Sequence, residues 1–145
     1  MYTHIVVGTD CSETADRAVS KAAEVAKMTG ATLHLVCVYR EPTPAMAVAD
    51  APTIFVSNLT ADAVEAQTVH VEALAARLRV DGIDVEARVE IGAAAATLVG
   101  VADAVDAELL VVGDRGLKGV RGLLGSVPNR VTHRASIDVL VVHTT

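Results

Sequence analysis

Short apolar runs alternate along this 145-residue chain with longer stretches in which apolar positions recur every three or four residues. The short runs predict β-strands at residues 5–7, 32–39, 85–91, 109–112 and 139–142. The first run is apolar throughout and is followed by Gly8-Thr9-Asp10, which is typical of a central parallel strand and its turn. Residues 85–91 alternate apolar with charged side chains, which predicts a half-buried strand nearer a sheet edge.

The stretches between the strands have the spacing of amphipathic helices. Their apolar faces consist of Ala15, Ala18, Val19, Ala22 and Ala26; then Val64, Thr68, Val71, Leu74, Ala75 and Leu78; then Leu98, Val101, Ala102 and Val105. A fourth helix runs from Ser126, a good N-cap residue, to about Arg134, with Pro128 in its first turn. The alternation predicts an α/β fold, an open five-stranded parallel sheet with helices on both faces, as one domain over residues 1–145.

Residues 40–60 are less regular than the rest of the chain. Pro42, Pro44 and Pro52 break helix and sheet alike, and the apolar group Ile54-Phe55-Val56 follows them. We interpret this stretch as a surface insertion. It is either a lid or partner contact, or a merely variable connection.

Composition narrows the function classes. The chain is 52% hydrophobic with two Tyr, one Phe and no Trp, so its core is built from small aliphatic side chains. A formal net charge of −6 argues against a general nucleic-acid or anionic-membrane surface. No apolar run is long enough to span a bilayer, and the N-terminus enters a strand without a signal peptide. Cys11 and Cys37 form no disulfide framework, so a cytoplasmic location is expected.

Five glycines follow the strand at residues 109–112 and lead into the last helix. Backbone N–H groups in such a turn can cradle phosphate, and a helix N-terminus adds its positive dipole end. The alternative is a plain glycine-rich connection in which Ser126 only caps its own helix. In an open parallel sheet, ligands bind at the carboxyl ends of the strands. The turns at residues 8–10 and 113–116 therefore form the expected pair of walls.

Other chemistry finds little support in the sequence. The loop lacks the Lys of a Walker A motif, and no spacing of His and Cys matches a zinc site, so we assign no catalytic residue and no metal ligand. Asp10 either holds Mg²⁺ through water, or caps the first helix or meets a sugar hydroxyl. Cys11 and Cys37 can approach in space, as a redox pair or as two small core residues.

Three segments together are typical of a known family: Ile5-Val6-Val7-Gly8-Thr9-Asp10-Cys11-Ser12, Leu110-Val111-Val112-Gly113-Asp114-Arg115-Gly116, and Leu124-Gly125-Ser126-Val127 with Val139-Leu140-Val141-Val142. Through them the chain resembles the universal stress protein family over nearly its whole length. The nucleotide-binding branch is marked by Gly-x2-Gly-x9-Gly-(Ser/Thr). Gly113, Gly116 and Gly125-Ser126 match that pattern, but residues 117–124 are one residue shorter than its spacing.

The resemblance implies a Rossmann-like fold that binds an adenine nucleotide in stress response or signalling. Gly8 and Asp10 would lie beside the nucleotide, with Asp10 near the adenosine, and Val38 would line the adenine pocket. The ribose and phosphates would be held by Gly113, Gly116, Gly125, Ser126 and Val127, with Arg115 in reach of a phosphate. ATP, with Mg²⁺ possible, is the first expected ligand, and cyclic AMP or AMP is the alternative.

The resemblance also implies a homodimer in which Val139-Leu140-Val141-Val142 pairs across a two-fold axis. Two other functions are weighed against nucleotide binding. One is a dimeric interaction module without a ligand, and the other is a slow ATPase, for which the sequence offers no candidate base.

Overall fold

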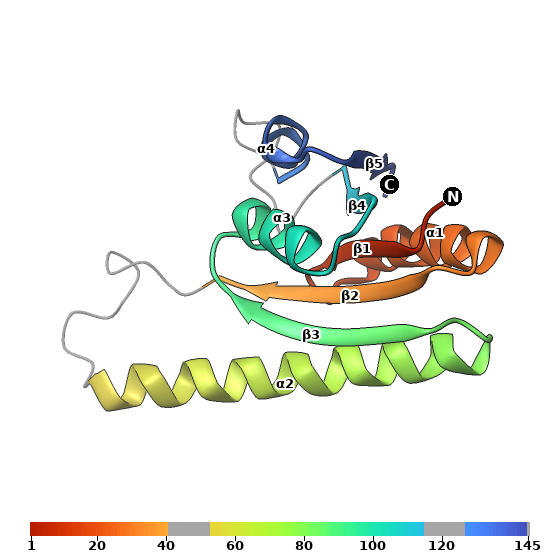
Figure 1. Ribbon diagram of the computed structural model, residues 1–145. Helices are drawn as coiled ribbons and strands as arrows, with labels where there is room; N and C mark the ends of the chain where they lie inside the picture. Colours follow the sequence, from red (N-terminus) through yellow and green to blue (C-terminus); the bar gives the residue numbers. More distant parts are fainter. Residues whose placement is uncertain (41–52, 115–126, 145) are drawn as a thin grey trace.

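The structure, a computed structural model, describes residues 1–40, 53–114 and 127–144, with the backbone alone over residues 53–59. Five strands and four helices alternate along the chain (Figure 1). Their bounds are β1 His4–Thr9, α1 Glu13–Thr29, β2 Thr32–Tyr39, α2 Thr53–Val80, β3 Val85–Ile91, α3 Ala94–Ala104, β4 Leu109–Gly113, α4 Val127–Arg134 and β5 Asp138–Val142. The predicted order and types of the elements are confirmed.

All strand pairs are parallel, and the order in the sheet is β3-β2-β1-β4-β5. β1 lies at the centre, where Val6 is paired with His34 of β2 and with Leu110 of β4. β3 forms one edge, as its alternation of apolar and charged residues predicts, and β5 forms the other. The chain runs outward from β1 to β3, then returns past β1 to β4, so the strand order reverses between β1 and β4.

Helices cover both faces of the sheet, as predicted: α1 and α2 on one face, α3 and α4 on the other (Figure 1). Successive β1 residues alternate between the two cores, since Ile5 and Val7 face α1 and α2 while Val6 faces α3 and α4. The α1 face that packs on the sheet consists mostly of alanine. Gly30 ends α1 in a left-handed conformation with φ of 74°, which glycine adopts without steric cost.

The expected irregular stretch is partly helical, because α2 begins at Thr53 and so includes Ile54-Phe55-Val56. Our interpretation of residues 53–60 as part of an insertion was therefore wrong. Proline is disfavoured in helix interiors but is tolerated ahead of the first turn. Pro52 is therefore compatible with a helix that begins at Thr53. With 28 residues, α2 is about 42 Å long and extends beyond the carboxyl ends of β2 and β3 (Figure 1). The rest of the stretch, residues 41–52, lies outside the described residues.

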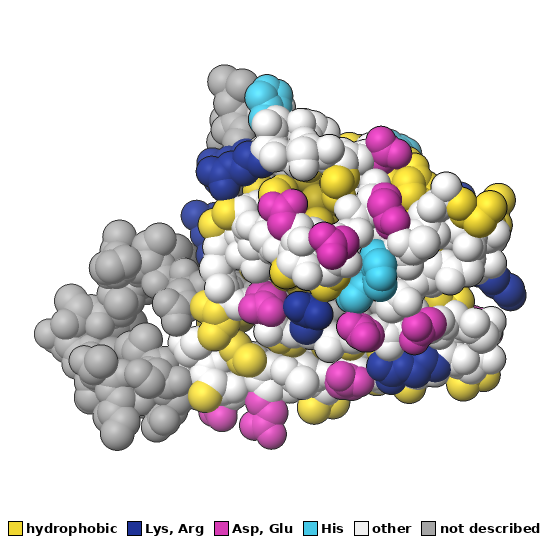
Figure 2. Space-filling view, viewed as in Figure 1, with side chains coloured by type: hydrophobic (Ala, Val, Ile, Leu, Met, Phe, Trp, Pro, Cys, Tyr) yellow, Lys and Arg dark blue, Asp and Glu magenta, His cyan; other side chains and the backbone are white. Residues whose placement is uncertain are grey.

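The surface of the described residues is charged and mixed. Asp and Glu side chains are spread among Lys and Arg over the face shown in Figure 2, rather than gathered in one block. Across residues 1–40, 53–114 and 127–144, no helix combines the length and the apolar character needed to cross a membrane.

Removing core volume at the sheet centre tests this packing. Leu110 is fully buried between β1 and β5, and we expect Leu110→Ala to lower the free energy of unfolding by about 2–5 kcal/mol through lost burial and a residual cavity. Urea denaturation measures the change. Val69 on α2 is 66% exposed, so Val69→Ala is the control and should stay within about 0.5 kcal/mol of the parent. Equal losses in both variants would contradict the core assignment.

Candidate functional site

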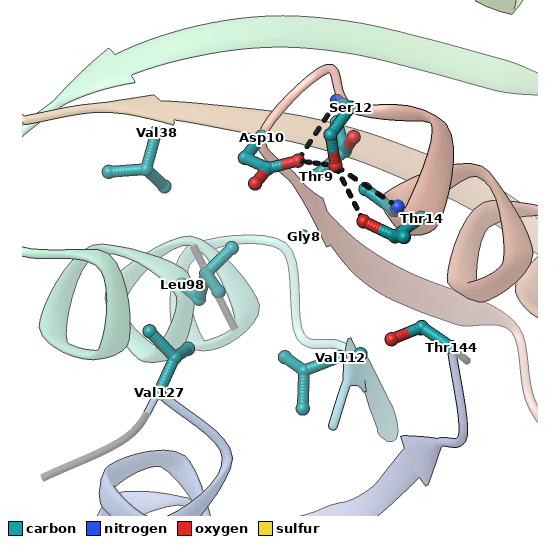
Figure 3. A pocket seen from close by; sticks show the side chains of 12 residues that line it. Gly8, Thr9, Asp10, Ser12, Thr14, Val38, Leu98, Val112, Val127 and Thr144 are labelled. Carbon is teal, nitrogen blue, oxygen red and sulfur yellow. Dashed lines mark hydrogen bonds between the residues drawn. The ribbon is translucent and has the colours of Figure 1, made fainter. Parts of the chain in front are cut away.

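A pocket opens at the carboxyl ends of the strands, where the strand order reverses between β1 and β4 (Figure 3). It holds about 430 Å³ of free space, including solvent at its mouth. The lining residues are Gly8, Thr9, Asp10, Ser12, Thr14, Ala15, Val38, Leu98, Val112, Gly113, Val127 and Thr144. This hollow, here called the switch-point pocket, occupies the place at which ligands bind in open α/β sheets.

The turn between β1 and α1 forms the polar wall of the pocket. Oδ1 of Asp10 accepts a hydrogen bond from the Ser12 backbone N–H at 2.9 Å and a short one from the Ser12 hydroxyl. The Ser12 hydroxyl in turn accepts from the Ala15 N–H at 3.2 Å, so the N-cap of α1 is Ser12. The expectation that Asp10 caps the first helix is therefore wrong. Asp10 instead holds the residue that does, and its carboxylate lies at the pocket (Figure 3).

The opposite end of the pocket is fixed by Asp114, which follows β4. Its Oδ1 accepts hydrogen bonds from the Thr144 backbone N–H at 3.0 Å and from the Thr144 hydroxyl at 2.6 Å. Its Oδ2 lies 2.8 Å from Nδ1 of His143. The hydrogen bonds from Thr144 are the main cause that lowers the pKa of Asp114 to about 2, with His143 adding to them. Asp114 thus ties the residues after β5 to the end of β4, and Thr144 becomes part of the pocket lining.

Glycine at two strand ends allows a neighbouring side chain to approach closely. A Cβ added to Gly8 would stand 2.7 Å from Cδ1 of Leu98, and one added to Gly113 would stand 2.9 Å from Cγ2 of Thr144. Neither contact leaves room for a larger side chain without movement of its neighbour. The two glycines therefore let Leu98 and Thr144 reach the strand ends and line the pocket.

The structure brings together five residues that the sequence singled out: Gly8, Asp10, Val38, Gly113 and Val127. They come from four different elements or their ends, and all line the switch-point pocket. The other four, Arg115, Gly116, Gly125 and Ser126, lie outside the described residues. The described part of the last helix runs from Val127 to Arg134 and includes Pro128 near its start, while the expected N-cap, Ser126, lies outside the described residues.

Sequence reasoning missed several lining residues. Leu98 was assigned only to the core face of its helix, and Thr144 follows the last strand and was given no role. The predicted parallel sheet was itself a signal for Thr144. The carboxyl ends of parallel strands lie at the same end of a sheet, so the residues that follow the last strand must lie near the ligand site. Ser12 and Thr14 had a similar signal in their position directly after the turn that ends β1.

The arrangement suits the binding of a small molecule with an apolar and a polar side. Figure 3 shows Val38, Leu98 and Val127 on one side of the pocket, with Asp10, Ser12 and Thr14 on the other. Within the described part of the chain, no group of three or more His, Cys, Asp or Glu is placed to hold a metal ion. The fold and the pocket thus define an α/β protein with a ligand site at its topological switch point.

The chain belongs to the universal stress protein family, whose family model matches residues 1–143. It is 39% identical over 145 residues to universal stress proteins of two Mycobacterium tuberculosis strains, covering 99% of this chain and 98% of theirs. A crystal structure of a universal stress protein in complex with cAMP is 36% identical, with a TM-score of 0.73 and 99% of each chain covered. A universal stress protein from Archaeoglobus fulgidus in complex with dAMP shares the fold at 24% identity, with a TM-score of 0.59 and 97% of each chain covered.

The Asp114 contacts predict a specific pH dependence. Because the folded-state pKa lies below the ordinary value of 3.8, the carboxylate contributes stability above about pH 4 that is lost as the pH falls toward about 2. We expect Asp114→Asn to flatten this part of the stability profile, measured by urea denaturation at a series of pH values. Glu108, whose pKa is also lowered to about 2, contributes equally to both proteins.

Asp62→Asn makes the same substitution at an exposed position on α2, away from Asp114, and is the matched control. An Asp114→Asn profile as steep as that of the parent between about pH 4 and about pH 2 would show that Asp114 does not clamp the C-terminal residues.

Proposed function

We propose that this protein binds an adenine nucleotide in the switch-point pocket and acts by binding in a stress response or in signalling. The observation that carries the proposal is the pocket itself, where predicted nucleotide contacts from separate elements converge beside β1 and β4. The cAMP complex of a universal stress protein 36% identical to this chain adds independent support.

The pocket lining suits a nucleoside. Val38, Leu98 and Val127 offer apolar surface to the faces of an adenine ring. The Asp10 carboxylate can accept hydrogen bonds from ribose hydroxyls, and its position is fixed by Ser12. Asp10 is therefore proposed as a sugar contact, in preference to a direct metal ligand.

The phosphate would bind at the far side of the pocket, between Gly113 and the N-terminus of α4. Val127 is the first residue of α4, so the free N–H groups of that helix start at the pocket. On sequence grounds, Arg115, Gly116, Gly125 and Ser126 complete the phosphate site. We favour a monophosphate such as cyclic AMP or AMP as the ligand, and ATP is the alternative. Mg²⁺ accompanying ATP would depend on phosphate and water oxygens, with Asp10 as an outer contact.

The pocket favours retention of the ligand over its turnover. The described lining residues are Gly, Ala, Val, Leu, Ser, Thr and one Asp, so none supplies a Lys, Arg or His to stabilise a transferring phosphoryl group. We therefore propose a protein that holds its nucleotide and hydrolyses ATP slowly if at all. Cysteines kept as free thiols accord with the cytoplasmic location that we infer.

A bulky side chain at the apolar wall tests the proposal. We expect Val38→Phe to weaken binding of cyclic AMP or AMP by at least about tenfold, because the added ring takes the place of the adenine; this corresponds to about 1.4 kcal/mol. Calorimetric titration with cyclic AMP, AMP and ATP measures the change, and circular dichroism checks the fold. Mass spectrometry of small molecules released on denaturation identifies any ligand retained through purification.

Val80 near the end of α2 is 87% exposed, so Val80→Phe makes the same substitution away from the pocket and should bind normally. Parent protein that binds none of the three nucleotides would overturn the proposal. Binding unchanged in Val38→Phe would place the nucleotide elsewhere.

We also propose that the protein forms a homodimer through β5. β5 is an edge strand, and its residue Val141 is 41% exposed. An apolar edge strand is a natural surface for self-association, and a two-fold axis would pair it with itself. Val139 packs on the core beneath α3 and α4, so Val141 is the residue of this strand that we select for substitution.

Placing a charge on this edge should disrupt the dimer. We expect Val141→Lys to shift the protein from dimer to monomer at micromolar concentration, as measured by light scattering after gel filtration. Val69→Lys on the exposed side of α2 is the matched control and should leave the mass unchanged. A parent protein that is already monomeric under these conditions would refute the assembly.

A further inference from the structure

The only two cysteines of the chain are brought together beside the switch-point pocket. Cys11 follows β1 in the turn to α1, and Cys37 lies in β2, directly opposite Thr9 of β1. The parallel pairing of β1 and β2 therefore places residues distant in sequence side by side. Their Sγ atoms lie 3.3 Å apart, and both are free thiols.

The two thiols differ in access to solvent. Cys37 is fully buried, and its Sγ lies 3.2 Å from Oε1 of Gln67, an acceptor on α2. Cys11 is half-buried and lies in the turn that leads into α1, so a small reagent can reach it from solvent. A partly accessible thiol backed by a buried one is the arrangement in which the first reacts and the second resolves.

The thiols also differ in acidity. The contact with Cys37, whose single S–H can be donated to Cys11 or to Gln67 but not to both at once, is the main cause that lowers the pKa of Cys11. It prevails over burial and over the carboxylates of Asp10 and Asp16. The same contact, together with burial, raises the pKa of Cys37. Cys11 also lies two residues before the first residue of α1, where the positive end of the helix dipole favours a thiolate. Cys11 is thus the nucleophile of the pair, and Cys37 keeps its proton.

The backbone at Cys11 is unusual for this residue type. Its φ is 65°, in the left-handed region that glycine occupies freely and a cysteine side chain disfavours. The Cys11 N–H is bonded to Oγ1 of Thr9 at 3.0 Å, which helps to hold the turn in this shape. This conformation directs the Cys11 sulfur toward β2 and Cys37.

We propose that Cys11 and Cys37 are a peroxide-reactive pair that closes into an intramolecular disulfide. In the first step, the Cys11 thiolate attacks one oxygen of hydrogen peroxide. A sulfur–oxygen bond forms, the oxygen–oxygen bond breaks, and the departing hydroxide takes a proton to become water. In the second step, the Cys37 sulfur attacks the Cys11 sulfenic acid, and the disulfide forms as the second oxygen leaves as water with the Cys37 proton. The two thiols together lose two electrons and two protons, and the peroxide is reduced to two water molecules.

The contact distance makes this closure accessible. A disulfide bond is about 2.05 Å long, so the two sulfurs must approach by only a little more than about 1 Å. One partner lies in a turn, which can supply this movement without disturbing the sheet. The proposal concerns the thiols alone and does not depend on what the pocket binds.

Mass spectrometry tests the proposal on the full-length protein. The reduced, folded protein is treated with hydrogen peroxide, denatured and alkylated with iodoacetamide. We expect the parent to lose two hydrogen atoms, to take up no alkyl group, and to yield one linked peptide pair containing Cys11 and Cys37. Dithiothreitol should restore both alkylation sites.

Single substitutions separate the roles of the two thiols. Cys37→Ala should leave a Cys11 sulfenic acid that is trapped by dimedone, because the resolving thiol is gone. Cys11→Ser should lose peroxide reactivity, leaving the buried Cys37 available for alkylation after denaturation. If Cys37→Ala fails to fold, Cys37→Ser replaces it in the same assay.

Several outcomes would overturn the proposal. One is a folded parent protein in which both cysteines are still alkylated after peroxide treatment. Another is a parent in which the only disulfide joins two chains. A third is unchanged oxidation of Cys37 in Cys11→Ser, because the buried thiol would then react without its partner.

Discussion

The burial of β1 between β2 and β4 is the constraint on which the rest of the molecule depends. Ile5, Val6 and Val7 are fully buried, so both faces of this strand must be covered by helices. Because all the strands are parallel, each connection has to cross back over the sheet. The carboxyl ends of all five strands therefore lie at the same end of the sheet. The connection after β1 leads to β2 on one side, and β4 lies on the other side of β1. The switch-point pocket opens between the carboxyl ends of β1 and β4.

Two carboxylates shape that opening in the same way. Asp10 comes shortly after the end of β1 and Asp114 directly after β4, and each accepts hydrogen bonds from the backbone and hydroxyl of one residue, Ser12 or Thr144. The Asp10–Ser12 contact fixes the turn before α1, and the Asp114–Thr144 contact fixes the residues after β5.

More of the fold than of the candidate site could be predicted from the sequence. Apolar periodicity located every strand and helix, because burial of β1 and its neighbours leaves a direct imprint on residue order. The start of α2 at Thr53 was not predicted, because three prolines between residues 42 and 52 favoured an irregular stretch up to residue 60. Leu98 and Thr144 line the pocket and pack closely against Gly8 and Gly113, and such contacts between residues distant in sequence are encoded by no local pattern.

The hydrogen bonds between Asp114 and Thr144 affect where a tag can be attached to this protein. The last described residue, Thr144, is buried in the pocket lining and is held there by Asp114. Affinity tags or fluorescent fusions attached there would crowd the opening and strain the Asp114 contacts. Met1, which is 99% exposed, gives a fusion partner open solvent instead, and the N-terminus is therefore the position from which to immobilise or label this protein.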